Sequence, residues 1–588
     1  MAAAVELQQL RRASWAEVTA TLLAFTAFPM TMPVAFARAG WWVGSVALVY
    51  MAAASWESGV LLGKLCVLLP AEQASDYPQL AAAAMATASR HPYAKRLRRA
   101  WASLSAMGAG SSADEPELER SSAAWAAFGR RGVAALQLLT YYLAAVVGII
   151  YLEQYFVQLF PGSSLCQAQW IFIVLLLMAP LQQIPTFKDS WAATILGATT
   201  LGVICLVFFY QVGSGRPWEC ELGPAYECFS CAGMSKNEAR DAKCETPCGN
   251  ISSGTPRSFA DVAEALNLMA YSFGGHGLYP ETIREMKHPQ GWRSVMVVVY
   301  SVLLPLYMLC GLLGFAAYGT FANANINLNW PNNAMNKVSI VANMVNVSFT
   351  LLITQLLQVL QVELALGVDP TAWWRTGDGS GGVAARMRPV VFRLFFRSLW
   401  LGSQVLLAEM LLSGEGDTLF ALQSLVGSVG MLALTFLLPF GFHLALHPQH
   451  EQPYRAANHT TLLDETELGE ADPAHIWLGD NLANSIESEE LDDGASEDMH
   501  GAESSLLDKS HQLRAGSSNM TLSEWGPYSV ARRWWHLGNI VVGVVLMGLG
   551  LYYSVQDLVG SSTGLFNGSC QIPFQYSPMD PRDPCYAP

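Results

Sequence analysis

The sequence predicts an all-α polytopic membrane protein with eleven transmembrane helices. Of the 588 residues, 52% are hydrophobic and only 14% are charged. Apolar stretches of about 20 residues recur along the whole chain, and each can cross roughly 30 Å of hydrocarbon as a helix. The net charge of −14 does not indicate a cationic ligand, because much of it lies in one acidic segment. The chain also lacks the basic stripe with interleaved aromatic residues that would indicate nucleic-acid binding.

The apolar stretches give the elements in order. The predicted spans cover residues 16–38, 42–69, 133–159, 167–187, 191–213, 259–281, 293–318, 335–365, 390–412, 418–446 and 534–558. The gap between spans two and three is hydrophilic, so we expect a cytosolic loop over residues 70–132. Residues 214–258 are rich in cysteine and are expected to form an outer loop.

Lysine and arginine residues near the span ends orient the chain. They gather before spans one and eleven, and also between spans two and three, six and seven, and eight and nine. Because such residues are in excess in cytosolic loops, we expect a cytosolic N-terminus and, after an odd number of spans, a C-terminus outside or in a lumen. Arg38, at the outer end of span one, is an exception. A plasma membrane and a vacuole- or lysosome-type membrane both fit this orientation.

Eight cysteines lie outside the spans, and all fall on the predicted outer side: Cys166, Cys220, Cys228, Cys231, Cys244, Cys248, Cys570 and Cys585. An even set in an oxidising compartment is typical of disulfide bonds. The alternative is a zinc site formed by the four cysteines between positions 228 and 248, but the outward placement favours disulfides. The glycosylation sequons at Asn250 and Asn567 lie on the same side.

An acidic segment at residues 447–532 differs from the rest of the chain. It is rich in serine, aspartate and glutamate and cannot bury enough apolar surface to fold alone. We expect a disordered cytosolic loop that is phosphorylated or binds a cytosolic partner. The alternative is a solvated linker with no specific role.

Span six contains an unusual stretch at residues 271–281, in which three glycines and a proline surround His276. Glycine and proline loosen a helix, and main chain freed inside a membrane is tolerated only where protein or a watery cavity satisfies it. An ionisable side chain at that depth indicates function. We therefore expect a broken helix that lines a binding site. The alternative is a kinked helix with a buried, hydrogen-bonded histidine.

Motifs in several spans resemble those of the amino acid/auxin permease family. Residues 33–41 (PVAFARAGW) are similar to the family's Pro-x-Ala-Phe-x-x-Ala-Gly-Trp, and residues 275–281 (GHGLYPE) to its Gly-His-x-x-x-Pro-Glu. Met-Lys-x-Pro at 286–289 and Leu-x-Gly at 425–427 also match in the right order. The resemblance implies a leucine-transporter-like core, with spans one to ten as a 5+5 inverted repeat plus one further helix. It also implies a secondary active transporter of amino acids.

This resemblance divides the chain into a transporter core at 1–446, the acidic loop at 447–532, the eleventh span at 533–558 and an outer tail at 559–588. It implies that spans one and six are broken where the substrate binds. The implied substrate-binding residues are Thr26, Ala27, Phe28, Met30, Thr31, Ser272, Phe273, Gly274 and Gly275. Two opposed breaks offer positive helix ends to a carboxylate and free carbonyls to an ammonium group. Where the family has glycines before the span-one motif, this chain has Phe28 and Met30, which would crowd that pocket.

Four residues are candidates for ion coupling or gating: His276, Glu153, Thr354 and Gln358. A histidine can change charge near physiological pH, and a carboxylate inside a span faces the bundle interior or water. For His276 the alternative is a structural hydrogen bond to span one, and for Glu153 it is a solvated position near the interface. Thr354 and Gln358 share one helical face and resemble a family pattern in span eight, where the alternative is interhelical hydrogen bonding. We expect Glu363 and Glu409, near span ends, to reach toward water.

The sequence contains no P-loop, paired-histidine metal motif or nucleophile elbow, so we expect neither an enzyme nor a cofactor. The coupling ion we expect is the proton, with sodium as the alternative. The expected partners are an amino acid substrate and the lipid bilayer. A competing hypothesis is a receptor that binds an amino acid and signals through the acidic loop.

Overall fold

The computed structural model describes residues 13–26, 28–69, 76–90, 115–160, 163–184, 191–214, 258–319, 322–330, 333–366, 383–412, 418–446 and 530–561. The chain divides into two compact units, Met1–Ala445 with His536–Pro588, and Leu446–Trp535. Of the second unit, the structure describes Leu446 and the first turns of the last helix. Every contact discussed below lies in the first unit.

The described secondary structure is helical, as predicted, apart from one bridge between Ala13 and Met286. The first predicted span contains α2 (Trp15–Thr26), the short helix η1 (Pro29–Thr31) and α3 (Met32–Ala39), and the second is α4 (Trp41–Leu68). Spans three to five are α7 (Glu115–Leu159), α8 (Gln167–Leu181) and α9 (Trp191–Ser214).

Span six contains α11 (Phe259–Ser272), the 3-10 turn η6 (His276–Leu278) and α12 (Tyr279–Glu285). A second 3-10 turn, η7 (Pro289–Gly291), leads into α13 (Trp292–Tyr318), and η9 (Ile326–Asn329) precedes α14 (Ala334–Ala365). The remaining elements are α15 (Val383–Leu412), α16 (Thr418–Val426), the π-helical segments η10 (Gly427–Met431) and η11 (Ala433–Leu437), and α20 (Val530–Ser561).

Nine helical segments among the described residues are long and apolar enough to cross a membrane, and each corresponds to a predicted span. The other two predicted spans do not meet this criterion. The apolar part of α8 is shorter, at Gln169–Leu181, and span six is divided into two short helices. The chain is therefore an integral, multi-pass membrane protein.

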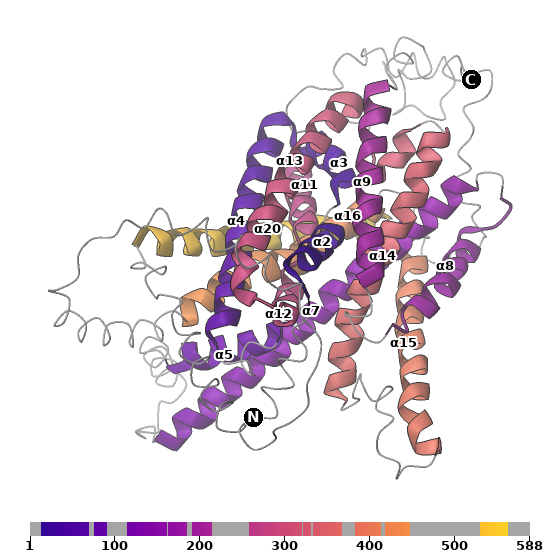
Figure 1. The fold of residues 1–588 in the computed structure, drawn as a ribbon. Helices are drawn as coiled ribbons and strands as arrows, with labels where there is room; N and C mark the ends of the chain where they lie inside the picture. Colours follow the sequence, from indigo (N-terminus) through magenta and orange to yellow (C-terminus); the bar gives the residue numbers. More distant parts are fainter. Residues whose placement is uncertain are drawn as a thin grey trace, which may run out of the picture. The chain divides into compact units, whose positions relative to one another are not determined.

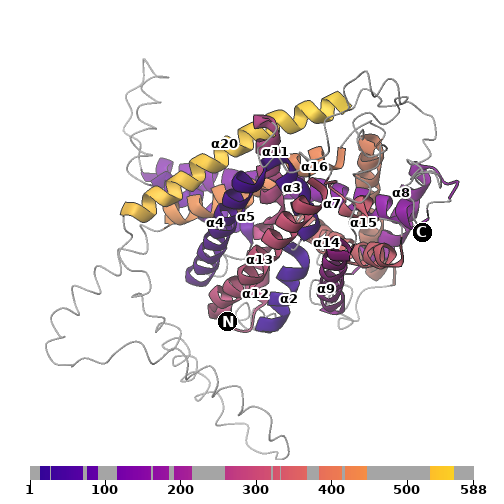
Figure 2. The same ribbon diagram turned by 90° about the horizontal axis from the view of Figure 1, so that it is seen from above.

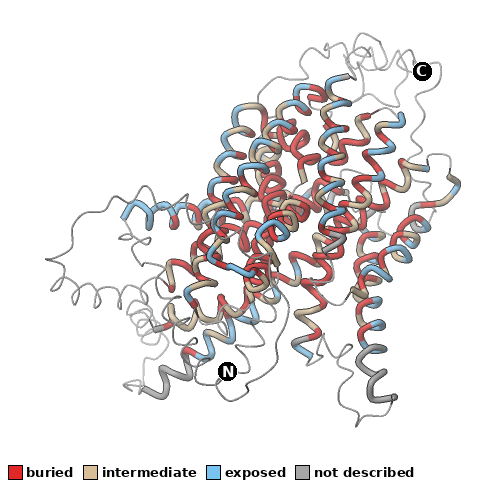
Figure 3. Tube along the Cα trace, in the orientation of Figure 1, coloured by how far each residue is buried: buried red, intermediate tan, exposed pale blue. Residues whose placement is uncertain are grey.

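Large apolar side chains on the outer faces of the helices fit this conclusion. Trp42, Val46 and Leu206 are 81%, 68% and 72% exposed, and similar residues recur on α15 and α20. Figure 3 shows buried positions concentrated on the inward faces of the helices and exposed ones on the outer faces. A protein surrounded by water would not expose so many large apolar side chains, whereas the hydrocarbon chains of a bilayer cover such surfaces.

The prediction of a hydrophilic loop over residues 70–132 is wrong in part. That stretch contains α5 (Tyr77–Arg90), and α7 begins at Glu115 rather than at 133. α5 packs along α7 (Figure 1) and buries Tyr77, Leu80, Ala81 and Ala84. These positions follow the spacing of one helical face, so α5 is an amphipathic helix that packs against the core.

Two sets of helices pack closely. α13 contacts α3 and α4, and α11 contacts α3, whereas α14 contacts α7 and α9, and α15 contacts α7 and α8. α20 lies across the other helices (Figure 2), and its hydrogen bonds reach Tyr50 on α4 and Ser424 on α16. Most of the cysteine-rich loop, nearly all of the acidic segment, and the sequons at Asn250 and Asn567 lie outside the described residues.

Candidate functional site

Helix one is interrupted between Thr26 and Met32, as the sequence predicts. Pro29 lies in the first turn of η1 and Pro33 in the first turn of α3. Proline has no N–H to donate, so it is tolerated in a first turn but breaks a helix interior. Phe28 precedes the short turn in a non-helical conformation, with φ −116° and ψ 61°. Ala27 lies outside the described residues.

Helix six is interrupted between Ser272 and His276, which confirms the predicted break. Glycine is needed at these positions because side chains from neighbouring elements come close. A methyl group on Gly274 would collide with Met431, and one on Gly275 would lie 2.6 Å from Cγ2 of Thr26. The two breaks therefore approach each other directly.

Polar contacts join the two breaks at the centre of the bundle. The hydroxyls of Thr31 and Ser272 lie 3.3 Å apart. The phenol oxygen of Tyr307, on α13, lies 2.5 Å from the Thr26 carbonyl oxygen and 2.8 Å from that of Ser272, and it accepts a hydrogen bond from the Phe28 N–H at 3.0 Å. Tyr307 thus satisfies main chain freed by both breaks. Nothing in the sequence of span seven singled it out.

Aromatic side chains cover one side of this centre. The ring centroid of Phe28 lies 6.4 Å from that of Tyr151 on α7 and 6.3 Å from that of Tyr271 on α11. Tyr151 is held by hydrogen bonds from its hydroxyl to the Ala324 carbonyl and from Gln423. Phe28 therefore lies against aromatic rings from two other helices, and its effect on a substrate pocket stays a prediction.

His276 is fully buried, and its ring is fixed against α4. Nε2 lies 2.9 Å from both Oγ of Ser58 and the carbonyl oxygen of Ser55, while Nδ1 has no hydrogen-bond partner among the described residues. Tyr279 packs on the ring at a centroid distance of 4.4 Å. The histidine thus makes a structural hydrogen bond, but to span two rather than to span one, and Nδ1 has no partner among the described residues.

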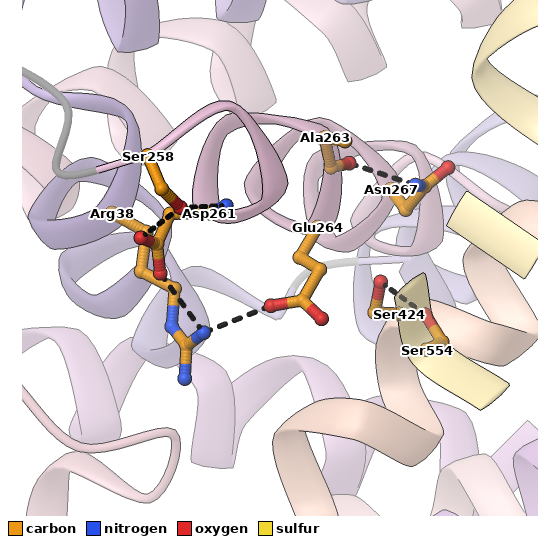
Figure 4. A network of polar contacts seen from close by, with 8 residues as sticks. All are labelled: Arg38, Ser258, Asp261, Ala263, Glu264, Asn267, Ser424 and Ser554. Carbon is orange, nitrogen blue, oxygen red and sulfur yellow. Dashed lines mark hydrogen bonds and ion pairs between the residues drawn. The ribbon is translucent and has the colours of Figure 1, made fainter. Parts of the chain in front are cut away.

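On the predicted outer side of the breaks, an ion-pair network joins helices one and six. Nη1 of Arg38 lies 3.2 Å from Oδ1 of Asp261 and 2.8 Å from Oε2 of Glu264. Figure 4 shows Arg38 from α3 reaching both carboxylates on α11. Its guanidinium also lies over the ring of Phe420, 3.8 Å from the centroid. Arg38, the exception in the charge pattern, therefore has partners for its charge.

The remaining coupling candidates do not lie at the breaks. Oγ1 of Thr354 donates to the Thr350 carbonyl within α14. Gln358 accepts hydrogen bonds from Trp400 and Gln404 on α15. This face of α14 therefore makes the interhelical contacts that the structural alternative predicted.

Two acidic residues predicted to be functional or solvated, Glu153 and Glu363, are buried in the spans. Glu153 is 2% exposed on α7 and interacts electrostatically with Glu409 on α15. The expectation that Glu363 reaches water is wrong. It is fully buried, and its carboxylate oxygens lie 2.8 and 3.0 Å from Nε and Nη2 of Arg397. Arg397 also donates to the carbonyls at the end of α8, so one buried cation joins three helices.

The cysteine predictions can be followed at four positions. Cys66, Cys205 and Cys310, which lie in spans, are free. Cys166, at the N-terminus of α8, is disulfide-bonded. The other seven predicted cysteines lie outside the described residues, so the pairing stays a prediction.

Sequence comparisons agree with this arrangement. The profile described as transmembrane amino acid transporter protein matches residues 11–466. Amino acid transporter AVT1C of Arabidopsis thaliana is 24% identical over 196 residues, which is 32% of this chain and 31% of that protein. Amino acid transporter AVT1J of the same plant is 26% identical over 103 residues, or 17% of this chain and 24% of that protein. The alignments thus span less than a third of either relative.

A set of membrane-length helices in which two broken helices meet defines a class of protein, the polytopic membrane proteins built like secondary transporters. Within this class, the chain belongs to the transmembrane amino acid transporter protein family. The family is one of transporters and not of enzymes. The resemblance predicted from the motifs of spans one, six and ten is confirmed.

Proposed function

We propose that the protein is a proton-coupled secondary active transporter of amino acids, and that it holds its substrate between the breaks of helices one and six. The observation that carries this proposal is the meeting of the two breaks. The hydroxyls of Thr31 and Ser272 lie side by side there, and Tyr307 lies within hydrogen-bond distance of one main-chain carbonyl from each break. Family membership and the printed names of the relatives support amino acids as the substrate.

The chemistry of the breaks suits a zwitterion. Short helices that begin at a break direct partial positive charge at a carboxylate, and carbonyls at the end of the preceding helix attract an ammonium group. α3 and α12 begin at the two breaks, and α2 and α11 end there. An amino acid carries both groups on one carbon, so the site needs no buried formal charge of its own.

Eleven spans result when α8 and the broken helix six are added to the nine membrane-length segments. In our proposal the first ten form two inverted repeats of five, and α20 follows as the eleventh. Helices one, two, six and seven would rock against the others to expose the site to each side in turn. Their mutual packing, α13 on α3 and α4 and α11 on α3, supports their moving together.

Proton coupling is assigned to His276. Its Nδ1 has no hydrogen-bond partner among the described residues and is the nitrogen left to take up a proton, while Nε2 is held by Ser55 and Ser58. Glu153, which faces Glu409, is the second coupling candidate. Sodium is the alternative coupling ion, since the Thr354 hydroxyl donates to the Thr350 carbonyl and keeps its oxygen lone pairs for a cation.

The test is uptake by purified protein in liposomes, with labelled amino acids and an imposed pH gradient. A gradient of about one pH unit can drive at most about tenfold accumulation per coupled proton. We expect accumulation of a subset of amino acids without sodium. Accumulation that depends on sodium would identify sodium, rather than the proton, as the coupling ion. Binding without flux would indicate a sensor that acts through the acidic loop.

Variants separate the substrate site from the coupling site. His276→Ala should abolish gradient-driven accumulation while the protein remains in the membrane, because the proton would lose its binding atom. Thr31→Ala and Ser272→Ala should weaken apparent substrate affinity and keep the pH dependence. Unchanged affinity in both hydroxyl variants would place the substrate elsewhere.

A further inference from the structure

Glu281 has a buried carboxyl group that takes no part in the proposed substrate site. It lies in the first turn of α12 and is 8% exposed, and Oε2 has no hydrogen-bond partner within the described part of the chain. An ionised carboxylate is strongly disfavoured in such surroundings, whereas the protonated acid is tolerated. The packed structure therefore favours a proton on this residue.

The groups that interact with Glu281 come from every side. On its own helix these are Arg284 and Glu285, and Asp76 approaches from the turn before α5. Cys66 faces it from α4 and Tyr141 from α7. The only cation in this set is Arg284, and two further carboxylates oppose its effect.

Tyr141 connects this carboxyl with the helix-six break. A methyl group on Gly277 would lie 2.5 Å from the Tyr141 phenol oxygen, so the hydroxyl lies directly against the turn that begins with His276. The same side chain interacts with Glu281. Gln137 binds the Gly277 carbonyl from the same helix at 2.9 Å. The segment from η6 into α12 thus carries two buried titratable groups, each with one atom that has no partner among the described residues, and α7 contacts this segment at Gly277.

The inner end of α12 is covered as well. The N–H of Ala13 donates to the Glu285 carbonyl, and the N–H of Lys287 donates to the Ala13 carbonyl, both at 3.0 Å. By the predicted topology this is the cytosolic side. Among the described residues, Ala13 therefore covers the inner end of α12, and separation of α12 from it would expose Glu281 further to water.

We propose that Glu281 is a proton-binding residue of the transport cycle, protonated while α12 is packed and ionised when α12 opens toward the cytosol. This inference rests on the proposed proton-coupled transport. The coupling follows from burial, because a proton on Glu281 stabilises the packed state and hydration stabilises the ionised, open state. Opening the inner side then releases the proton to the cytosol, and coupling to a gradient requires that the returning, ionised Glu281 be protonated again from the outer side, through the helix-six break.

The experiment compares four proteins in liposomes: the wild type, Glu281→Gln, Glu281→Asp and the control Glu17→Gln, which removes an exposed carboxylate on α2. Each is assayed with the labelled amino acid that the wild type takes up best. Accumulation under a pH gradient of about one unit measures coupling, and exchange at equal pH measures movement of substrate alone. We expect Glu281→Gln to lose the gradient-driven accumulation, up to about tenfold, and to keep exchange. Glu281→Asp should recover part of it, and Glu17→Gln should resemble the wild type.

Thermal unfolding of the purified proteins supplies a second measurement that needs no substrate. The wild type should lose more Tm than Glu281→Gln as pH rises, because only the wild type must bury an ionised carboxylate. Equal pH profiles, or full accumulation by Glu281→Gln, would overturn the role of Glu281 and leave proton coupling intact. No gradient-driven accumulation by the wild type would overturn both proposals.

Discussion

Replacing Tyr307 with phenylalanine should loosen the centre of the molecule. The hydroxyl lies within hydrogen-bond distance of the Thr26 and Ser272 carbonyls and accepts from the Phe28 N–H. One phenol proton serves one carbonyl at a time, so the variant loses one donated and one accepted bond. A buried group left without its partner costs about 1–3 kcal/mol. Allowing for partial relaxation, we expect a loss of about 2–4 kcal/mol in the free energy of unfolding.

The assay joins stability with function. Tm of the purified protein should fall, and apparent KM for the amino acid should rise, because the two breaks are no longer tied to α13. Tyr300→Phe is the matched control, since Tyr300 lies two turns away on the same helix and bonds Ser55 at 2.6 Å rather than a helix break. It should lose about 1 kcal/mol and keep its KM. If Tyr307→Phe and Tyr300→Phe have the same Tm and the same KM, the bridging role is refuted.

Two further substitutions test packing. Arg397→Met should cost about 3–5 kcal/mol because buried Glu363 loses both close hydrogen bonds and keeps only the Arg393 guanidinium, 3.5 Å away, and an added Glu363→Leu should recover part of the lost Tm. An Arg397→Met variant as stable as the wild type would contradict this expectation. Gly430→Ala should cost about 1–3 kcal/mol, because the methyl group would collide with Thr140. Gly402→Ala, which meets nothing within 4 Å, is the control and should leave Tm unchanged or higher.

Hydropathy and helix breakers predicted most of the fold. Nine predicted spans became membrane-length helices, and Pro29, Pro33 and the glycines of span six gave both breaks. These features are local, since a span is a property of about 20 consecutive residues and a break is a property of one proline or glycine. α5 was missed because its alanine-rich sequence has low hydropathy. The spacing of Tyr77, Leu80, Ala81 and Ala84 was the signal that could have found it.

The contacts across the bundle could not be predicted in the same way. Tyr307 is one of several aromatic residues in an apolar helix, and its partners lie 281 and 35 residues away in the sequence. Glu363 looked like a residue at a span end until Arg397, 34 residues on, was found against it. Helical periodicity shows that a side chain lies on one face, but only packing decides which helix that face meets.

The positions of the polar contacts bear on how the proposed transporter would move. Thr31 with Ser272, and His276 with Ser58, bind helices one, two and six together, while Arg397 binds α8, α14 and α15. A rocking motion keeps such contacts and changes those between the two groups. Gln137 with the Gly277 carbonyl is one of these, and the Arg38 guanidinium over Phe420 is another, on the opposite side of the breaks. The first would part when the inner side opens and the second when the outer side opens, so the two contacts need not break together. Alternating access needs this property, because one side must stay closed while the other admits substrate.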